Sequence, residues 1–195
     1  MGTGLYRKLG VAFVLLLLCA AGARGQIATP IDAFVGYSYF HTNAPPGQCG
    51  CFSMNGGTGE FSTLLVHGIS GLVDFGGYYQ GNVDNTGRTL RVETFLFGPR
   101  YSTHHWRKVT LFGESLFGGS TGSGTLYGPN ATTSGTASGF SMAAGGGVDL
   151  NVSHHISVRV LQADYVMTRM PNFLNNNQNN LRLNFGVVFH FGQGR

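Results

Sequence analysis

The sequence predicts an all-β protein, an antiparallel, up-and-down transmembrane β-barrel of about eight strands behind a cleaved signal peptide. Three observations support this prediction. The closing segment Leu181–Phe191 places a large apolar residue at every odd position, and strand side chains alternate between two faces. The same alternation recurs along the chain. Charged residues make up only 10% of the sequence, against about 25% in ordinary soluble domains.

Residues 1–25 have the features of an export signal. Arg7 and Lys8 supply the basic start, and the uncharged stretch Leu9–Ala23 follows it. Small residues then stand at the two positions that a signal peptidase reads, which makes Gln26 the expected first residue after cleavage.

The sequence leaves two alternatives to cleavage. A retained transmembrane helix is disfavoured, because the uncharged stretch is shorter than the ~20 residues that span a bilayer. A lipoprotein anchored at Cys19 is disfavoured by the bulky Leu18 before it. The remaining residues 26–195 are then expected to form a single outer-membrane barrel domain.

The strands can be placed in order from the alternation. In the first, Val35, Tyr37 and Tyr39 share one face, and in the third Phe75 alternates with Asp74. The predicted strands are Ile31–His41, Glu60–His67, Gly71–Gln80, Leu90–Ser102, Lys108–Phe117, Phe140–Val152, Ile156–Met167 and Leu181–Phe191.

Two predicted strands break the pattern. Arg91 and Glu93 stand at odd positions and would share a face with the apolar Phe95. Arg159 stands at an odd position and Gln162 at an even one, which would place these two polar residues on opposite faces. Either β-bulges reset the alternation, or the boundaries are off by a residue or two.

The connections alternate in length. Short turns are predicted at residues 68–70, 103–107 and 153–155, and longer connections, rich in Gly, Asn, Ser and Thr, at residues 42–59, 81–89, 118–139 and 168–180. In bacterial transmembrane barrels the short turns face the periplasm and the long loops face outward.

The chain resembles the small outer-membrane β-barrel families, and is similar to the transmembrane domain of the outer-membrane protein A type. The resemblance rests on the signal peptide, the aromatic closing strand, Phe34-Val35-Gly36-Tyr37-Ser38-Tyr39, Phe97-Gly98-Pro99-Arg100-Tyr101 and Gly145-Gly146-Gly147-Val148-Asp149. It implies a location in the bacterial outer membrane. The chain departs from the family where Gly192–Arg195 follows the last aromatic residue. No C-terminal peptidoglycan-binding domain, and therefore no tethering role, is expected.

Charged residues within the predicted strands are expected to face the lumen, because a charge facing lipid near the midplane costs ~2–4 kcal/mol. These residues are Asp74, Arg100, Glu114, Asp149, Arg159, Asp164 and Arg182. A barrel of about eight strands is just wide enough for its own side chains to fill. We therefore predict a salt-bridged plug, and the alternative is a polar network that gates or lines a path.

Cys49 and Cys51 lie in the first long connection. Export favours their oxidation, so we predict a disulfide between them. The alternative is a pair of free thiols or a weak soft-metal site. The pairs His104-His105 and His154-His155 are not expected to bind metal, because adjacent turn residues point apart. No metal and no cofactor are predicted.

The predicted function is structural or surface-interacting, and not enzymatic. Outer-membrane lipid and an extracellular surface or protein partner, contacted through the loops, are the expected partners of a monomer. Nucleic acid is excluded, because the chain without its signal peptide has 9 basic and 8 acidic residues. The alternatives are a small porin or solute channel, a lipid-modifying enzyme built on His41, and a soluble ligand-binding barrel. Aromatic residues near the strand ends disfavour the soluble barrel.

Overall fold

The computed structural model describes residues 30–43, 51–83, 85–106, 108–128, 132–171 and 176–192, with the side chains of 104–106 left aside. The strands are β1 (Ile31–Asn43), β2 (Cys51–Val66), β3 (Ile69–Val83), β4 (Arg88–Trp106), β5 (Val109–Gly124), β6 (Gly135–Asn151), β7 (Ile156–Thr168) and β8 (Gln178–Phe191). No helix within these ranges is long and apolar enough to cross a membrane.

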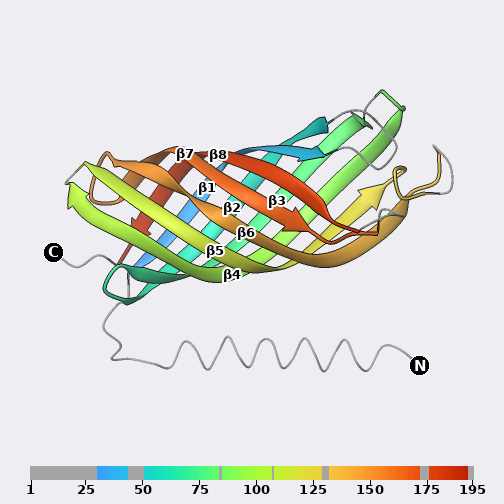
Figure 1. Cartoon of the computed structure of the whole chain (residues 1–195). Helices are drawn as coiled ribbons and strands as arrows, with labels where there is room; N and C mark the ends of the chain where they lie inside the picture. The colour runs from blue at the N-terminus through green and yellow to red at the C-terminus, as the bar shows by residue number, and fades with distance from the viewer. Residues whose placement is uncertain are drawn as a thin grey trace, which may run out of the picture.

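The eight strands form one closed barrel in sequence order. Each strand is antiparallel to its neighbours, and β8 returns to pair with β1, from Ile31 opposite Phe191 to Thr42 opposite Asn180. Figure 1 shows the tilted strands, with the start of β1 and the end of β8 at the same end of the barrel. The predicted antiparallel up-and-down barrel is confirmed.

The three connections predicted to be short lie at one end of the barrel, and the other four lie at the opposite end. β2 and β3 are joined by His67 and Gly68, β4 and β5 by residues 107–108, and β6 and β7 by residues 152–155. Gly68 has a φ of 76°, a value that glycine adopts without steric cost. We name this the periplasmic end and the opposite one the extracellular end, following the loop asymmetry of such barrels.

Three strands reach at least five residues further toward the extracellular end than the sequence predicted. β2 begins at Cys51 rather than Glu60, β5 continues to Gly124 rather than Phe117, and β6 begins at Gly135 rather than Phe140. Large parts of the predicted loops 42–59 and 118–139 are therefore strand. These parts are rich in Gly, Ser and Thr, and they lack the apolar outer face that identified the strands elsewhere.

One of the two irregularities is a β-bulge. In β7, Arg159 pairs with Asp149 while Leu161 pairs with Val148. Val160 and Leu161 consequently both face outward, 45% and 40% exposed. The extra residue returns Gln162 to the lumen side, so the predicted bulge is confirmed here.

The other irregularity is not a bulge. The ladder between β3 and β4 runs without a break from Leu90 to Tyr101, including Pro99. Arg91 and Glu93 remain on the outer face, where they form an exposed ion pair of 2.8 Å. Strand β4 therefore changes the polarity of its outer face without changing its register.

The outer wall carries a broad apolar band, which we call the lipid-facing band. Exposed side chains such as Val35, Phe61, Phe97 and Phe185 form it. Exposed tyrosines lie where the outer face turns polar, at Tyr37, Tyr79 and Tyr165. An apolar band edged by aromatic residues is the lipid-contacting surface of a transmembrane barrel.

Candidate functional site

The inward side chains form three layers along the barrel axis. A polar cavity lies at the periplasmic mouth, an ion-pair network fills the middle, and an apolar cluster with its own cavity occupies the extracellular part. Function at the lumen depends on whether these layers leave a path and on what each cavity can hold.

The predicted lumen charges form one connected network. Arg182 donates from Nε to Asp164, at 2.9 Å, and from Nη1 to Asp74, at 2.9 Å. Arg159 binds both carboxylate oxygens of Asp149, at 2.8 and 3.2 Å. A bidentate pair of this kind fixes the guanidinium plane as well as its position.

Two members of the network were missed by the sequence reasoning. Glu60 accepts hydrogen bonds from Arg100, at 2.6 Å, and Arg159, at 2.7 Å. Gln162 donates to Glu114, at 2.9 Å, and to Asp164, at 2.8 Å. Glu60 lies at the start of its predicted strand, where its alternation with the apolar Phe61 indicates an inward side chain.

Gln162 joins the network for a reason the sequence left open. It accepts a hydrogen bond of 2.6 Å from Arg159, although the two residues have opposite parities. The bulge at Val160–Leu161 brings both into the lumen. The sequence pattern allowed a bulge but did not locate it.

Aromatic rings and glycines complete this layer. Phe112 lies 4.3 Å from the Arg100 guanidinium and 4.4 Å from that of Arg159, measured to the ring centroid. Such contacts stabilise a desolvated cation. A Cβ on Gly145 would collide with Asp164, and one on Gly147 would collide with the Phe112 ring. These glycines make room for the network.

The side chains of the network are buried in the middle of the lumen. Arg159, Gln162, Asp164 and Arg182 are each 0–1% exposed. Their mutual ion pairs offset much of the penalty of burying these charges, although Glu60 Oε1, Asp164 Oδ1 and Arg182 Nη2 have no hydrogen-bond partner. The predicted salt-bridged lumen is therefore what the described residues show, with Asp74, Arg100, Glu114 and Asp149 also buried.

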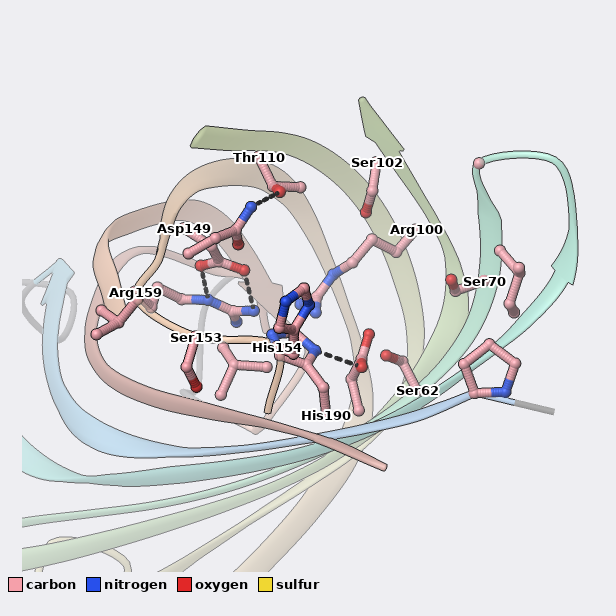
Figure 2. A pocket seen from close by; sticks show the side chains of 17 residues that line it. Ser62, Ser70, Arg100, Ser102, Thr110, Asp149, Ser153, His154, Arg159 and His190 are labelled. Atoms are coloured by element: carbon pink, nitrogen blue, oxygen red, sulfur yellow. Dashed lines mark hydrogen bonds and ion pairs between the residues drawn. The ribbon is translucent and has the colours of Figure 1, made fainter. Parts of the chain in front are cut away.

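The periplasmic cavity has a volume of about 500 Å³. Figure 2 shows hydroxyl side chains around it, including Ser62, Ser102 and Thr110, with Arg100 and Arg159 reaching into its inner side. Polar and charged side chains form most of its lining, and it shares no lining residue with the cavity in the extracellular part of the lumen.

A Ser-His-Asp arrangement borders this cavity. Ser157 Oγ lies 2.7 Å from His190 Nε2, and His190 Nδ1 lies 2.6 Å from Asp32. Ser157 is 0% exposed, and its hydroxyl donates to Asn151 at 2.8 Å. A nucleophile must reach its substrate and give its proton to the base, so this serine is arranged as a structural bridge between strands.

The extracellular part of the lumen is apolar. Phe40, Met54, Tyr78, Leu90, Val92, Leu96, Leu116 and Val166 pack together there. The rings of Phe40 and Tyr78 lie 4.4 Å apart. Transmembrane barrels usually have polar interiors, and for that reason the sequence reasoning did not anticipate this layer.

A cavity of about 380 Å³ opens beside the cluster, and we call it the extracellular cavity. Phe40, Met54, Val92 and Met170 are among its walls. Tyr127, from the connection after β5, also lines it and donates a hydrogen bond of 3.6 Å to the Met170 sulfur. Burial raises the pKa of the Tyr127 hydroxyl above its usual value.

The remaining candidate residues lie outside these layers. Cys51 begins β2, exposed and opposite Asn43. Cys49 lies outside the described residues, so the disulfide stays a prediction. His104 and His105 have no described side chains, and within the described ranges no group of three or more His, Cys, Asp or Glu residues is placed to hold a metal.

His41 has a partner that the sequence did not reveal. Its Nδ1 lies 2.9 Å from Ser53 Oγ, which also lies 2.6 Å from the Tyr39 hydroxyl. In the part of the chain that the structure describes, no carboxylate contacts His41 to complete a catalytic triad.

Neither a protein-family model nor a curated protein matches the sequence. Solved structures do. Neisserial surface protein A has a TM-score of 0.63 at 13% identity, over 83% of this chain and 97% of that one. The attachment invasion locus protein of Yersinia pestis has a TM-score of 0.59 at 14% identity, over 84% and 99%. OprG from Pseudomonas aeruginosa has a TM-score of 0.51 at 10% identity, over 86% and 98%.

The chain has the fold of the small bacterial outer-membrane β-barrels. The matches span nearly the whole of each neighbour, and the strand order is the same closed meander that the sequence predicted. The fold together with the lipid-facing band places the protein in the outer membrane, as predicted. At 10–14% identity the likeness concerns the fold, and the function of this outer-membrane barrel must be argued from its own residues.

Proposed function

We propose that this outer-membrane barrel is a closed, non-catalytic anchor whose function lies in recognition at its extracellular end. The observation that carries the proposal is the buried ion-pair network. Arg159 and Arg182 extend across the lumen from β7 and β8 to acidic residues on β2 and β3, Glu60 and Asp74. A barrel of about eight strands has little interior beyond what its side chains occupy.

The extracellular end provides the surface for recognition. β2, β4, β5 and β6 have 16 to 19 residues each, whereas about 9–11 residues suffice for a transmembrane strand. Their extra length extends toward the long connections. The similar protein of Yersinia pestis has also been solved in complex with the heparin analogue sucrose octasulfate, which supports an extracellular ligand as an expectation for this barrel.

The two alternative functions receive less support. A solute channel would require the network to open, which means separating several buried ion pairs at once. A lipid-modifying enzyme would use the contact between His41 and Ser53, but a serine nucleophile needs its base oriented by a third group.

Conductance of the refolded chain in planar lipid bilayers tests the proposal. The wild type is expected to show no large, stable conductance. A double variant, Arg159→Gly with Arg182→Gly, removes the two largest fully buried side chains of the lumen and serves as the opened reference. Folding of each sample is checked by the shift in gel mobility on heating. Stable wild-type conductance comparable to that of the double variant would overturn the proposal in favour of a channel.

A further inference from the structure

The wall of the barrel reverses its polarity near the extracellular end. In β2, Ser53 and Asn55 face outward while Phe52 and Met54 are buried inside. Further along the same strand, Phe61 faces outward, 57% exposed, while Glu60 is buried. The two parts belong to one continuous strand, because β2 pairs with β3 from Asn55 to Leu64 without a register shift.

An apolar interior behind a polar wall is the arrangement of a soluble ligand-binding barrel. Packed protein interiors contain few voids larger than a water molecule. The extracellular cavity, at about 380 Å³, is far larger than such voids, and it falls in the ~300–1,000 Å³ range of small-molecule sites.

The cavity also has a defined charge. Among the described residues that line it, Arg88 is the only charged one. Its Nη1 makes one long hydrogen bond, 3.5 Å to the Thr125 carbonyl, and no described carboxylate pairs with it. The polar residues Thr86, Asn43 and Gln178 also line the cavity. The walls thus combine an apolar pocket with one cation that no carboxylate of the described residues contacts.

We propose that the extracellular cavity binds a small amphiphilic anion, with its apolar chain or ring against Phe40, Met54 and Val92 and its acid group at Arg88. This inference rests on the proposed function and names the ligand chemistry of the extracellular end. Bilayer lipid is not the occupant, because the cavity lies inside the barrel and the lipid-facing band lies on its outer wall.

Decanoate with a fluorine at its terminal carbon is the probe, and ¹⁹F NMR is the readout. The full mature chain is placed in phosphatidylcholine nanodiscs, and nanodiscs without protein measure partition into lipid. We expect a saturable, protein-dependent signal for the wild type. A signal no different from that of the empty nanodiscs would overturn the inference.

Matched variants locate the site. Thr42→Phe and Leu126→Trp each place a ring at the extracellular cavity, one from β1 and one from the connection after β5. Each is expected to weaken binding at least tenfold. Ser102→Phe fills the periplasmic cavity instead and is expected to leave binding unchanged. If Ser102→Phe abolishes binding, or both extracellular variants leave it intact, the assigned site is wrong.

Arg88→Gln tests the charge. Because Arg88 is only half-buried and an ion pair that water reaches contributes little, decanoate binding is expected to weaken only about three- to fivefold. Binding of the neutral analogue, fluorinated decanol, is expected to stay the same. An equal effect on both probes would overturn the role of Arg88. Absence of binding in a barrel that does not conduct refutes this inference and leaves the closed anchor standing, whereas stable conductance refutes the closed anchor.

Discussion

The two parts of this barrel reverse the relation between inside and outside. In the membrane part, the outer wall is apolar and the lumen holds Arg159, Arg182 and their carboxylates. In the extracellular part, the outer wall carries Arg91 and Glu93, and the lumen holds Leu90 and Val92. One strand, β4, passes through both arrangements without a bulge.

The comparison shows that the solvent outside each part determines which residues fill its interior. Where the wall faces lipid, apolar residues are needed outside, and the interior can hold a network of ion pairs. Where the wall faces water, the hydrophobic effect places apolar residues inside. Binding to the interior is therefore expected in the extracellular part, and closure in the membrane part.

The largest effect is expected from breaking the network. Arg182→Leu leaves Asp74 and Asp164 buried without their cation, which should lower the free energy of unfolding by about 3–5 kcal/mol. Glu93→Gln, which breaks the exposed pair with Arg91 in the extracellular part, should cost less than about 1 kcal/mol. Urea unfolding in lipid vesicles measures both. Similar costs for the two variants would contradict the assignment of closure to the network.

The apolar cluster should be almost as sensitive. Leu96 is 0% exposed, so Leu96→Ala should cost about 2–5 kcal/mol through lost packing and the cavity it leaves. Its neighbour Phe95 faces outward against Phe75, with ring centroids 5.0 Å apart. Phe95→Ala should lose about 0.5–1.5 kcal/mol for the aromatic pair. The same unfolding experiment compares them, and a larger loss for Phe95→Ala would show that the cluster is not a packed core.

Arginine scanning of the outer wall locates the boundary between the two parts. Phe185 lies near the middle of the apolar face of β8, so Phe185→Arg should cost about 2–4 kcal/mol. Thr136, at the extracellular end of β6, is exposed on the polar wall, and Thr136→Arg should cost about 0–1 kcal/mol. Yield of the folded, heat-modifiable form in vesicles is a second readout. Equal costs would place Thr136 in lipid as well.

The sequence predicted the membrane part better than the extracellular part. Asp74, Arg100 and Arg182 were assigned to the lumen because they alternate with lipid-facing apolar residues, and this rule holds wherever lipid surrounds the wall. The same rule did not predict a strand at residues 51–59, because the outer face of this segment is polar and rich in glycine. The local alternation of Phe52 and Met54 with Ser53 and Asn55 was present, but with the opposite parity.

The parity change was visible in the sequence, but its cause was not. In β4 the apolar residues move from even positions, Leu90 and Val92, to odd positions, Phe95 and Phe97. A bulge and a change of surroundings produce the same pattern in a single sequence. Only the unbroken pairing with β3 distinguishes them. The extracellular cavity depends on that distinction, so the sequence alone did not predict it.

The smallest expected effect concerns Tyr127, which lines the extracellular cavity. Burial raises the pKa of its hydroxyl above the usual value near 10, so folding favours the neutral form. The associated stability is complete below the unfolded pKa and is lost as pH rises through the folded pKa. The ionisation of tyrosine is followed by absorbance near 295 nm as the pH is raised. Subtracting the curve of Tyr127→Phe from that of the wild type gives the ionisation of Tyr127 alone. Its midpoint should lie above that of free tyrosine and rise further with bound decanoate, because a carboxylate nearby disfavours a second negative charge. A midpoint near that of free tyrosine would show that the cavity is open to water at this wall.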